Sequence, residues 1–212
     1  MAITSPPAEP PGAVRGAADG IHPCRGRPTA ASLSRCVRSC VRSDRRLMLD
    51  AVENRYLLRP AGEPDLPLLS RWRALPHVSR WWGDPAIEAE IEKLRERRIA
   101  MWIAEFEGRP FAFIQDYDIR AWSPHHFDYL PPGSRGMDVY IGEPAMLGSG
   151  HGSRLVRQHV DRLFTLGSPA VGIDPHPDNA AALRAFEKAG FSITSGPLDT
   201  RWSRGILMHR FA

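Results

Sequence analysis

The chain has 212 residues, of which 42% are hydrophobic and 25% charged, a composition typical of one globular domain with its own core. It contains no run of about 18 apolar residues, so no membrane-spanning helix is predicted. The formal charge of +4 is uneven: residues 1–47 hold eight arginines and three acidic residues, which leaves 20 basic and 21 acidic residues in 48–212. This near-neutral second segment argues against a basic nucleic-acid-binding domain.

The N-terminal segment differs from the rest of the chain. Residues 1–47 are rich in Pro, Ala, Arg, Ser and Gly with little apolar periodicity, so we expect a disordered extension preceding a domain at 48–212. A transit peptide is conceivable, but the prolines disfavour an amphipathic helix. A translated upstream segment, with Met48 as the natural start, is the favoured interpretation. The arginines also leave open weak, nonspecific binding of anions or nucleic acid.

All three cysteines, Cys24, Cys36 and Cys40, lie in this extension. A disulfide framework for the domain is therefore excluded, which fits a reducing cytoplasm. Their spacing matches no strong zinc pattern, and we expect no metal.

Apolar spacing and turn signals predict the first elements of the domain. In chain order these are a strand at 55–61, helices at 63–75 and 84–98, strands at 99–108 and 109–119, a loop at 121–134 and a strand at 135–143. The second helix begins with Asp84–Pro85, a cap followed by proline in the first turn. Glu107-Gly108-Arg109 forms the hairpin turn between the paired strands.

The remaining elements follow a glycine-rich turn. They are a helix at 152–167, a strand at 170–175, a helix at 177–190 and strands at 191–198 and 204–212. Gly190 serves as the C-cap of the second of these helices. Strands interleaved with helices indicate a mixed α/β layer fold.

The stretch "LGSGHGSRLV", residues 147–156, places three glycines in six positions directly before a helical pattern. Glycine permits positive φ and close backbone approach to a ligand. A helix start also presents free N–H groups and a positive dipole end, which together favour an anion. A plain glycine-rich connection from strand to helix is the simpler alternative.

This turn and the later segment "IDPHPDNAAALRAFEKAGF" together resemble the GNAT superfamily of acyl-CoA-dependent N-acyltransferases. The resemblance spans about residues 55–211. Within the superfamily the chain is most similar to bacterial aminoglycoside 6′-N-acetyltransferases, through "HVSRWWGD", "GRPFAFIQDYD", "RGMDVYIGEPAMLGSGHG" and "DPHPDNAAALRAFEKAGF". It implies a central mixed sheet of about seven strands, flanked by about four helices. Leu147 departs from the family's usual Arg or Gln.

The resemblance implies that acetyl-CoA is the co-substrate, without a metal, and that its pyrophosphate is held by N–H groups from about Gly148 to Ser153. Asn179 would contact the pantetheine arm. The cofactor-binding residues expected on this basis are Val139, Tyr140, Ile141, Gly148, Ser149, Gly150, His151, Gly152, Ser153, Asn179 and Phe186.

Acetyl transfer needs a neutral amine, and a carboxylate can take the amine's proton. Asp138 is the candidate base, because it interrupts a strand whose Met137, Val139 and Ile141 occupy the other face, and the resemblance assigns the same role. A surface strand position is the alternative. Phe186 stands where many family members have a tyrosine that protonates the leaving thiolate, and phenylalanine has no proton to give.

The expected acceptor pocket, by the same resemblance, has several acidic and aromatic members, some of which carry a structural alternative. Asp174 contacts an amine or caps the next helix, although Asp178 or Asn179 fits that cap better. Of the adjacent tryptophans, one packs inward and one lines the pocket. Asp118 is a candidate turn cap, and Trp122, His125, His126 and Asp128 lie in a long loop. The substrate-binding set is Trp81, Trp82, Gln115, Asp116, Tyr117, Asp138 and Asp174.

The acceptor expected from this set is a polycationic aminoglycoside, because the acidic residues would attract it. Other acceptors remain open: a siderophore precursor, a polyamine or a protein N-terminus. A non-catalytic acyl-CoA-binding protein is the alternative from another class. The expected assembly is a monomer or a homodimer.

Overall fold

The computed structural model describes residues 56–82, 96 and 98–212. The helix predicted at 84–98 lies almost entirely outside the described residues, and the extension at 1–47 lies wholly outside them.

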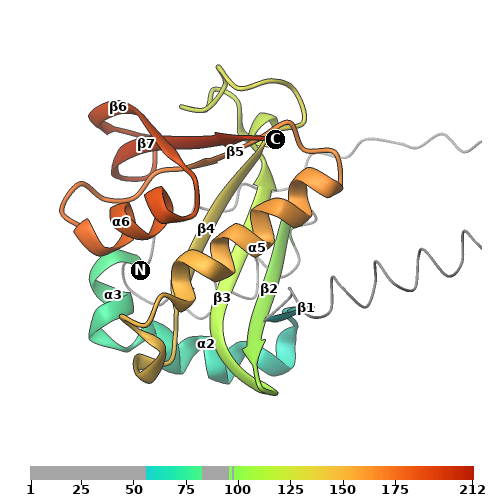
Figure 1. Ribbon diagram of the computed structural model, residues 1–212, viewed down its shortest axis with the longest axis vertical. Coiled ribbons are helices and arrows are strands. Elements are labelled where there is room, and N and C mark those ends of the chain that lie inside the picture. Colours follow the sequence, from blue (N-terminus) through green and yellow to red (C-terminus); the bar gives the residue numbers. More distant parts are fainter. Residues whose placement is uncertain (1–55, 83–95, 97) are drawn as a thin grey trace, which may run out of the picture. The chain divides into compact units, whose positions relative to one another are not determined.

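Seven strands form one mixed sheet in the order β1-β2-β3-β4-β5-β7-β6 (Figure 1). Their bounds are β1 Leu57–Pro60, β2 Ile99–Phe106, β3 Arg109–Asp118, β4 Arg135–Ile141, β5 Ala170–Ile173, β6 Ser192–Asp199 and β7 Arg204–Phe211. Every neighbouring pair is antiparallel except β4 and β5, which run parallel. The helix α5 (His151–Thr165) lies in the crossover that joins these two parallel strands.

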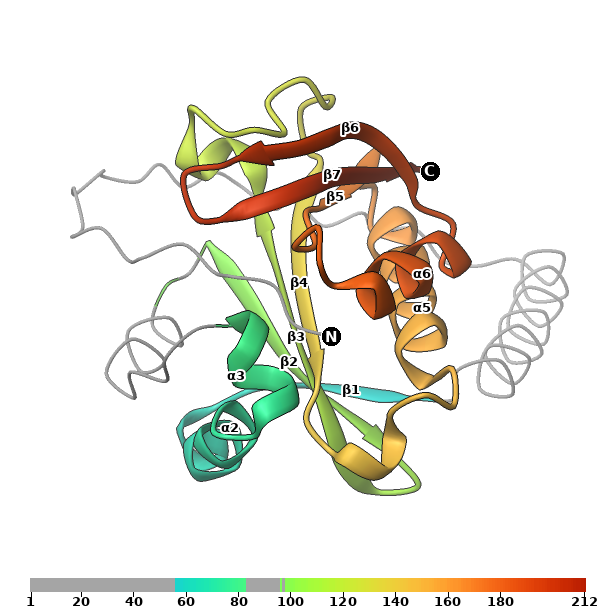
Figure 2. The same cartoon turned by 90° about the vertical axis from the view of Figure 1, so that its left-hand side faces the viewer.

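Helices cover both faces of this sheet (Figures 1 and 2). α5 and α6 (Ala180–Lys188) pack on one face, where their apolar residues share a core with Ile114, Met137 and Val139. α2 (Leu66–Arg73) and α3 (Pro76–Trp82) pack on the other face, against Phe113 and Tyr140. Successive strand residues point to opposite faces, so β2, β3 and β4 contribute to both cores.

The parallel pair β4 and β5 stays together for a short distance. Its register pairs Arg135 with Val171 and Gly136 with Gly172. Beyond Gly136 the two strands diverge, with β4 running on toward the turn before α5 (Figure 1). Beyond Gly136, the backbone N–H and C=O groups of β4 on the side of β5 therefore make no hydrogen bonds to β5 within this pairing.

The predicted fold class and the seven strands are confirmed, with small shifts at the ends. The helix predicted at 63–75 begins as the 3₁₀ turn η1 (Glu63–Asp65) and ends at Arg73. α3 was not predicted as a helix, because its seven residues are too few to show apolar periodicity. The predicted loop contains the end of a 3₁₀ turn, η2 (Ile119–Trp122), and another 3₁₀ turn, η3 (Pro144–Met146), precedes α5. Within the described part of the chain, no helix is long and apolar enough to cross a membrane.

Candidate active site

Asp138 lies in the middle of β4 and is almost fully buried, with 1% of its surface exposed. Its neighbours Met137 and Val139 enter the core beneath α5, so its own side chain points to the opposite face, as the alternating pattern predicts. Gln115 is its cross-strand partner on β3, and the Gln115 Nε2 donates to Asp138 Oδ2 at 2.6 Å. The neighbouring strand therefore holds the candidate base in one orientation.

A second carboxylate, Asp174, directly follows β5 and is also buried. Burial raises the pKa of Asp174 well above its usual value, and the nearby charge of Asp138 raises it further. Burial likewise raises the pKa of Tyr117, with Asp138 and Asp174 adding to the effect. Asp138, Asp174 and Tyr117 are therefore close enough to influence one another electrostatically.

Gly136 makes room for this arrangement. A Cβ on Gly136 would lie 2.4 Å from the Tyr117 ring, so only glycine lets that ring lie against β4. The pairing of Gly136 with Gly172 is also the last before β4 and β5 separate. The acidic group therefore lies where the two strands begin to diverge.

The two adjacent tryptophans of α3 differ in burial. Trp82 is buried and packs edge-on against Tyr140, with ring centroids 4.9 Å apart. Trp81 is half-buried and lies 5.5 Å from the ring of His176, two residues beyond Asp174. Trp81 is thus the less buried of the two and lies beside the segment that follows Asp174, whereas Trp82 belongs to the core.

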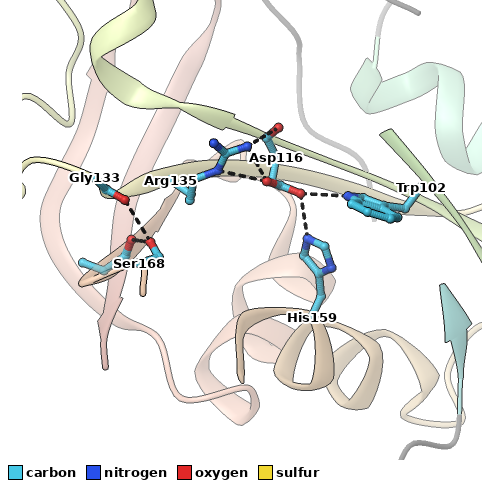
Figure 3. Close-up of polar contacts among 7 residues, drawn as sticks. Trp102, Asp116, Gly133, Arg135, His159 and Ser168 are labelled. Atoms are coloured by element: carbon cyan, nitrogen blue, oxygen red, sulfur yellow. Dashed lines mark hydrogen bonds and ion pairs between the residues drawn. The ribbon is translucent and has the colours of Figure 1, made fainter. Parts of the chain in front are cut away.

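Asp116 is not brought to this group, which corrects the expectation for that residue. It follows Gln115 on β3, so its side chain faces α5 instead of α3. Its carboxylate accepts hydrogen bonds from Arg135 and from Trp102 Nε1 and lies 3.0 Å from His159 Nε2 (Figure 3). Burial raises the pKa of Asp116, but the hydrogen bond and charge of His159 and the charge of Arg135 outweigh it and hold that pKa below its usual value.

This cluster predicts a structural role for Asp116. Asp116→Ala is expected to lower the free energy of unfolding by about 3–5 kcal/mol, because it leaves Arg135 and His159 without their carboxylate inside the protein. Asp161→Ala is the matched control, since Asp161 is half-exposed and its ion pair with Arg210 is worth about 1 kcal/mol or less. Urea denaturation of both variants measures the difference, and equal losses would contradict the structural role.

The glycine turn has the backbone geometry of an exposed anion site. Gly148 and Gly150 have φ of +75° and +79°, and Gly150 is the N-cap of the 15-residue α5. No side chain caps the helix start, so its first N–H groups remain available to a ligand. Arg154 lies across the turn and donates from Nη2 to the Ser149 carbonyl at 2.9 Å. This cation was not singled out from the sequence.

Other residues expected at the cofactor have side chains turned into the core. Val139, Ile141 and Phe186 pack in the core beneath α5, and Tyr140 packs in the core beneath α3. The ring of His151 lies against Phe106 and Phe111. In β4 and at His151, the backbone is therefore the part left for a ligand to contact, and the side chain of Phe186, also expected at the cofactor, is fully buried.

The model of the acetyltransferase (GNAT) domain matches residues 62–195. The chain therefore belongs to the GNAT acetyltransferase family. It is 32% identical over 150 residues to aminoglycoside N(6′)-acetyltransferase type 1 of Klebsiella pneumoniae, an alignment that covers 63% of this chain and 72% of the relative. A kanamycin resistance protein of Rhizobium radiobacter is 44% identical over 63 residues, or 28% of this chain and 56% of that protein.

Solved structures agree with this assignment. The GNAT acetyltransferase is similar, with a TM-score of 0.67 and 30% identity, to AAC(6′)-Ib in complex with parmomycin and acetyl-CoA; the match covers 74% of this chain and 93% of that one. The same enzyme solved with coenzyme A and kanamycin matches with a TM-score of 0.67 and 29% identity over 74% and 94% of the two chains. A spermidine N-acetyltransferase from Vibrio cholerae, at 15% identity, shares the fold.

The residues present fit acetyl-CoA. The exposed turn and Arg154 suit a pyrophosphate, and the divergence of β4 from β5 leaves backbone groups for an extended arm. Asn179 caps α6 by accepting from the Ala182 N–H through Oδ1, as foreseen from the sequence. Its Nδ2 is buried without a hydrogen-bond partner among the described residues, so a donor is ready for a carbonyl of the ligand.

The raised pKa of Asp174 predicts a pH-dependent cost in stability for the acetyltransferase. A raised pKa in the folded state means that stability falls as the pH rises through that pKa. Asp174→Asn should therefore raise Tm relative to the parent at about pH 8 and much less at about pH 5. Asp178→Asn, at an exposed position in the same segment, should show no such trend. Thermal melts at both pH values check this, and a pH-independent difference would contradict it.

Proposed function

We propose that this chain transfers the acetyl group of acetyl-CoA to a primary amine of an aminoglycoside, at the 6′ position. The observation that carries the proposal is the buried pair Asp138 and Asp174, placed where β4 leaves β5 and leads into the glycine turn. Two carboxylates in one buried site suit a substrate that brings several ammonium groups. The relatives named above support the choice of acceptor.

Each part of the site has a task in this reaction. Acetyl-CoA supplies an activated acetyl thioester. The turn at Gly148 and Gly150 holds its pyrophosphate, and Asn179 fixes its arm. Asp138, oriented by Gln115, accepts the proton that the attacking amine gives up. Asp174 balances a positive charge of the bound acceptor.

Phe186 leaves the leaving thiolate without a proton donor at that position. The ring is fully buried beside Phe191. A thiol with a reference pKa of about 8.5 leaves without strong acid assistance, so the reaction proceeds with water as the proton source. Because the thiolate is a weak base, the enzyme can turn over with phenylalanine in place of a proton donor at position 186.

Release of free thiol from acetyl-CoA tests the proposal directly. Kanamycin and ribostamycin should support turnover, whereas spermidine and lysine derivatives should support little. Mass spectrometry of the product should show one added acetyl group on the 6′ amine. Turnover of spermidine with none of the aminoglycosides would overturn the proposed acceptor while leaving the acetyltransferase activity in place.

A further inference from the structure

The loop between η2 and β4 brings two histidines to the acidic site. Phe127 is fully buried and anchors this loop on β5, where a Cβ on Gly172 would lie only 2.8 Å from its ring. The rings of His125 and His126 lie 4.1 Å apart, and both pack against Trp202. The anchor and this aromatic packing hold His126 in one place.

His126 points at the carboxylate of Asp174. Its Nε2 lies 3.4 Å from Asp174 Oδ2, and only 9% of its side chain is exposed. Neither ring nitrogen has a hydrogen-bond partner within the described part of the chain, so the approach to Asp174 is a contact without hydrogen-bond geometry. Buried polar atoms in folded proteins normally have partners, so the unpaired ring of His126 is available to a group bound beside Asp174.

The surroundings of His126 favour its neutral imidazole. Burial lowers the pKa of His126 to about 3, the neighbouring His125 lowers it further, and Asp128 acts in the opposite direction. A neutral imidazole has one nitrogen that accepts a hydrogen bond. A cation bound next to Asp174 favours the ionised form of that carboxyl, so this nitrogen and the carboxylate then offer two acceptors to one group, which suits an ammonium with its three donors.

We propose that His126 is a specificity-determining residue that, with Asp174, holds a second ammonium group of the acceptor beside the amine that is acetylated at Asp138. The inference rests on the proposed function and refines it: the preferred acceptors carry two amines close together, as diamino sugars do. A hydroxyl in place of the second amine loses the charge that Asp174 balances.

The test compares His126→Phe and His126→Gln with the parent enzyme. His126→Phe keeps the ring but removes the acceptor, so KM for a diamino acceptor should rise by about tenfold or more while kcat changes little. His126→Gln restores an oxygen acceptor and should recover most of the affinity. Tyr129→Phe, at an exposed residue of the same loop, should leave KM unchanged. KM for acetyl-CoA reports any general damage to the site.

The acceptor itself supplies the decisive comparison. Two kanamycin-type aminoglycosides that differ by an amino or a hydroxyl group next to the acetylated amine are assayed with each variant. The effect of His126→Phe should be large for the diamino compound and small for the hydroxyl compound. Equal effects on both acceptors, or an unchanged KM, would overturn the proposal. If His126→Phe does not fold, calorimetry measures the binding of the same two acceptors to the parent and to His126→Gln. If neither protein bound the diamino compound more tightly than the hydroxyl compound, the proposal would be overturned.

Failure of the proposed function is recognised separately. If the parent acetylates spermidine and no aminoglycoside, the same comparison is made between spermidine and a monoamine of similar length. A selective effect of His126→Phe on the polyamine would support the second-ammonium site in that case. An equal effect on both would overturn it.

Discussion

Asp138→Asn is expected to lower kcat by about 10²-fold or more while leaving acetyl-CoA affinity nearly unchanged, as is typical for loss of a general base. The carboxamide keeps the shape and the contact with Gln115 at the buried position in β4. It has no negative charge and does not take the ammonium proton. Steady-state rates from about pH 6 to 9 with a good acceptor measure the loss.

Asp118→Asn is the control for this experiment. Asp118 ends β3, is exposed, and accepts a hydrogen bond from the Arg120 N–H as the cap of η2. Asparagine also caps, so its rates should match those of the parent. If Asp138→Asn kept the parent's rates over the whole pH range, the base would not be Asp138, and Asp174 would be the next carboxylate to test.

Gly150→Asp is expected to abolish acetyl-CoA binding. The φ of +79° at Gly150 is costly for a residue with a side chain. The new Cβ would also lie 2.9 Å from Nη1 of Arg154, so the carboxylate would neutralise the cation beside the turn and repel phosphate. Isothermal calorimetry with acetyl-CoA measures the loss, and undiminished affinity would disprove the assignment of the turn.

Gly108→Asp separates backbone strain from electrostatics. Gly108 lies in the hairpin turn between β2 and β3 with φ of +73°, and nothing is within 4 Å of a Cβ placed there. The same substitution at this position introduces comparable strain far from the turn before α5. Its acetyl-CoA affinity should equal that of the parent even if Tm falls.

The position of Asp138 was predictable because it depends on strand alternation. Three apolar neighbours on β4 predicted one buried face, and the structure places Met137, Val139 and Ile141 there. The same alternation puts Gln115 and Asp116 of β3 on opposite faces, so assigning both to the substrate pocket overlooked the strand pattern. Strand alternation did not predict the hydrogen-bonding partners of Asp116, because His159 and Arg135 come from distant segments of the chain.

Other parts of the site depend on tertiary packing. His126 approaches Asp174 only because Phe127 anchors its loop on β5, and no local pattern relates these residues. Arg154 lies in the first turn of α5, and its side chain points back over the glycine turn. Side chains of a helix generally point toward its N-terminus, so this rule alone does not identify Arg154 as the residue that contacts the turn. The sequence analysis named His126 as part of a long loop near the expected pocket, but its approach to Asp174 could not be predicted.

The short pairing of β4 with β5 has a practical consequence for finding ligands. The antiparallel strands β1–β4 and the group β5–β7 are joined within the sheet by the pairs at Arg135 and Gly136. A ligand that forms hydrogen bonds with both diverging strands, β4 and β5, adds contacts between β1–β4 and β5–β7. Its binding should therefore raise Tm. Ligand present at 100 times its Kd adds about 2.7 kcal/mol of stability. A melting screen over acyl-CoA thioesters therefore ranks the donors before any amine acceptor has been identified.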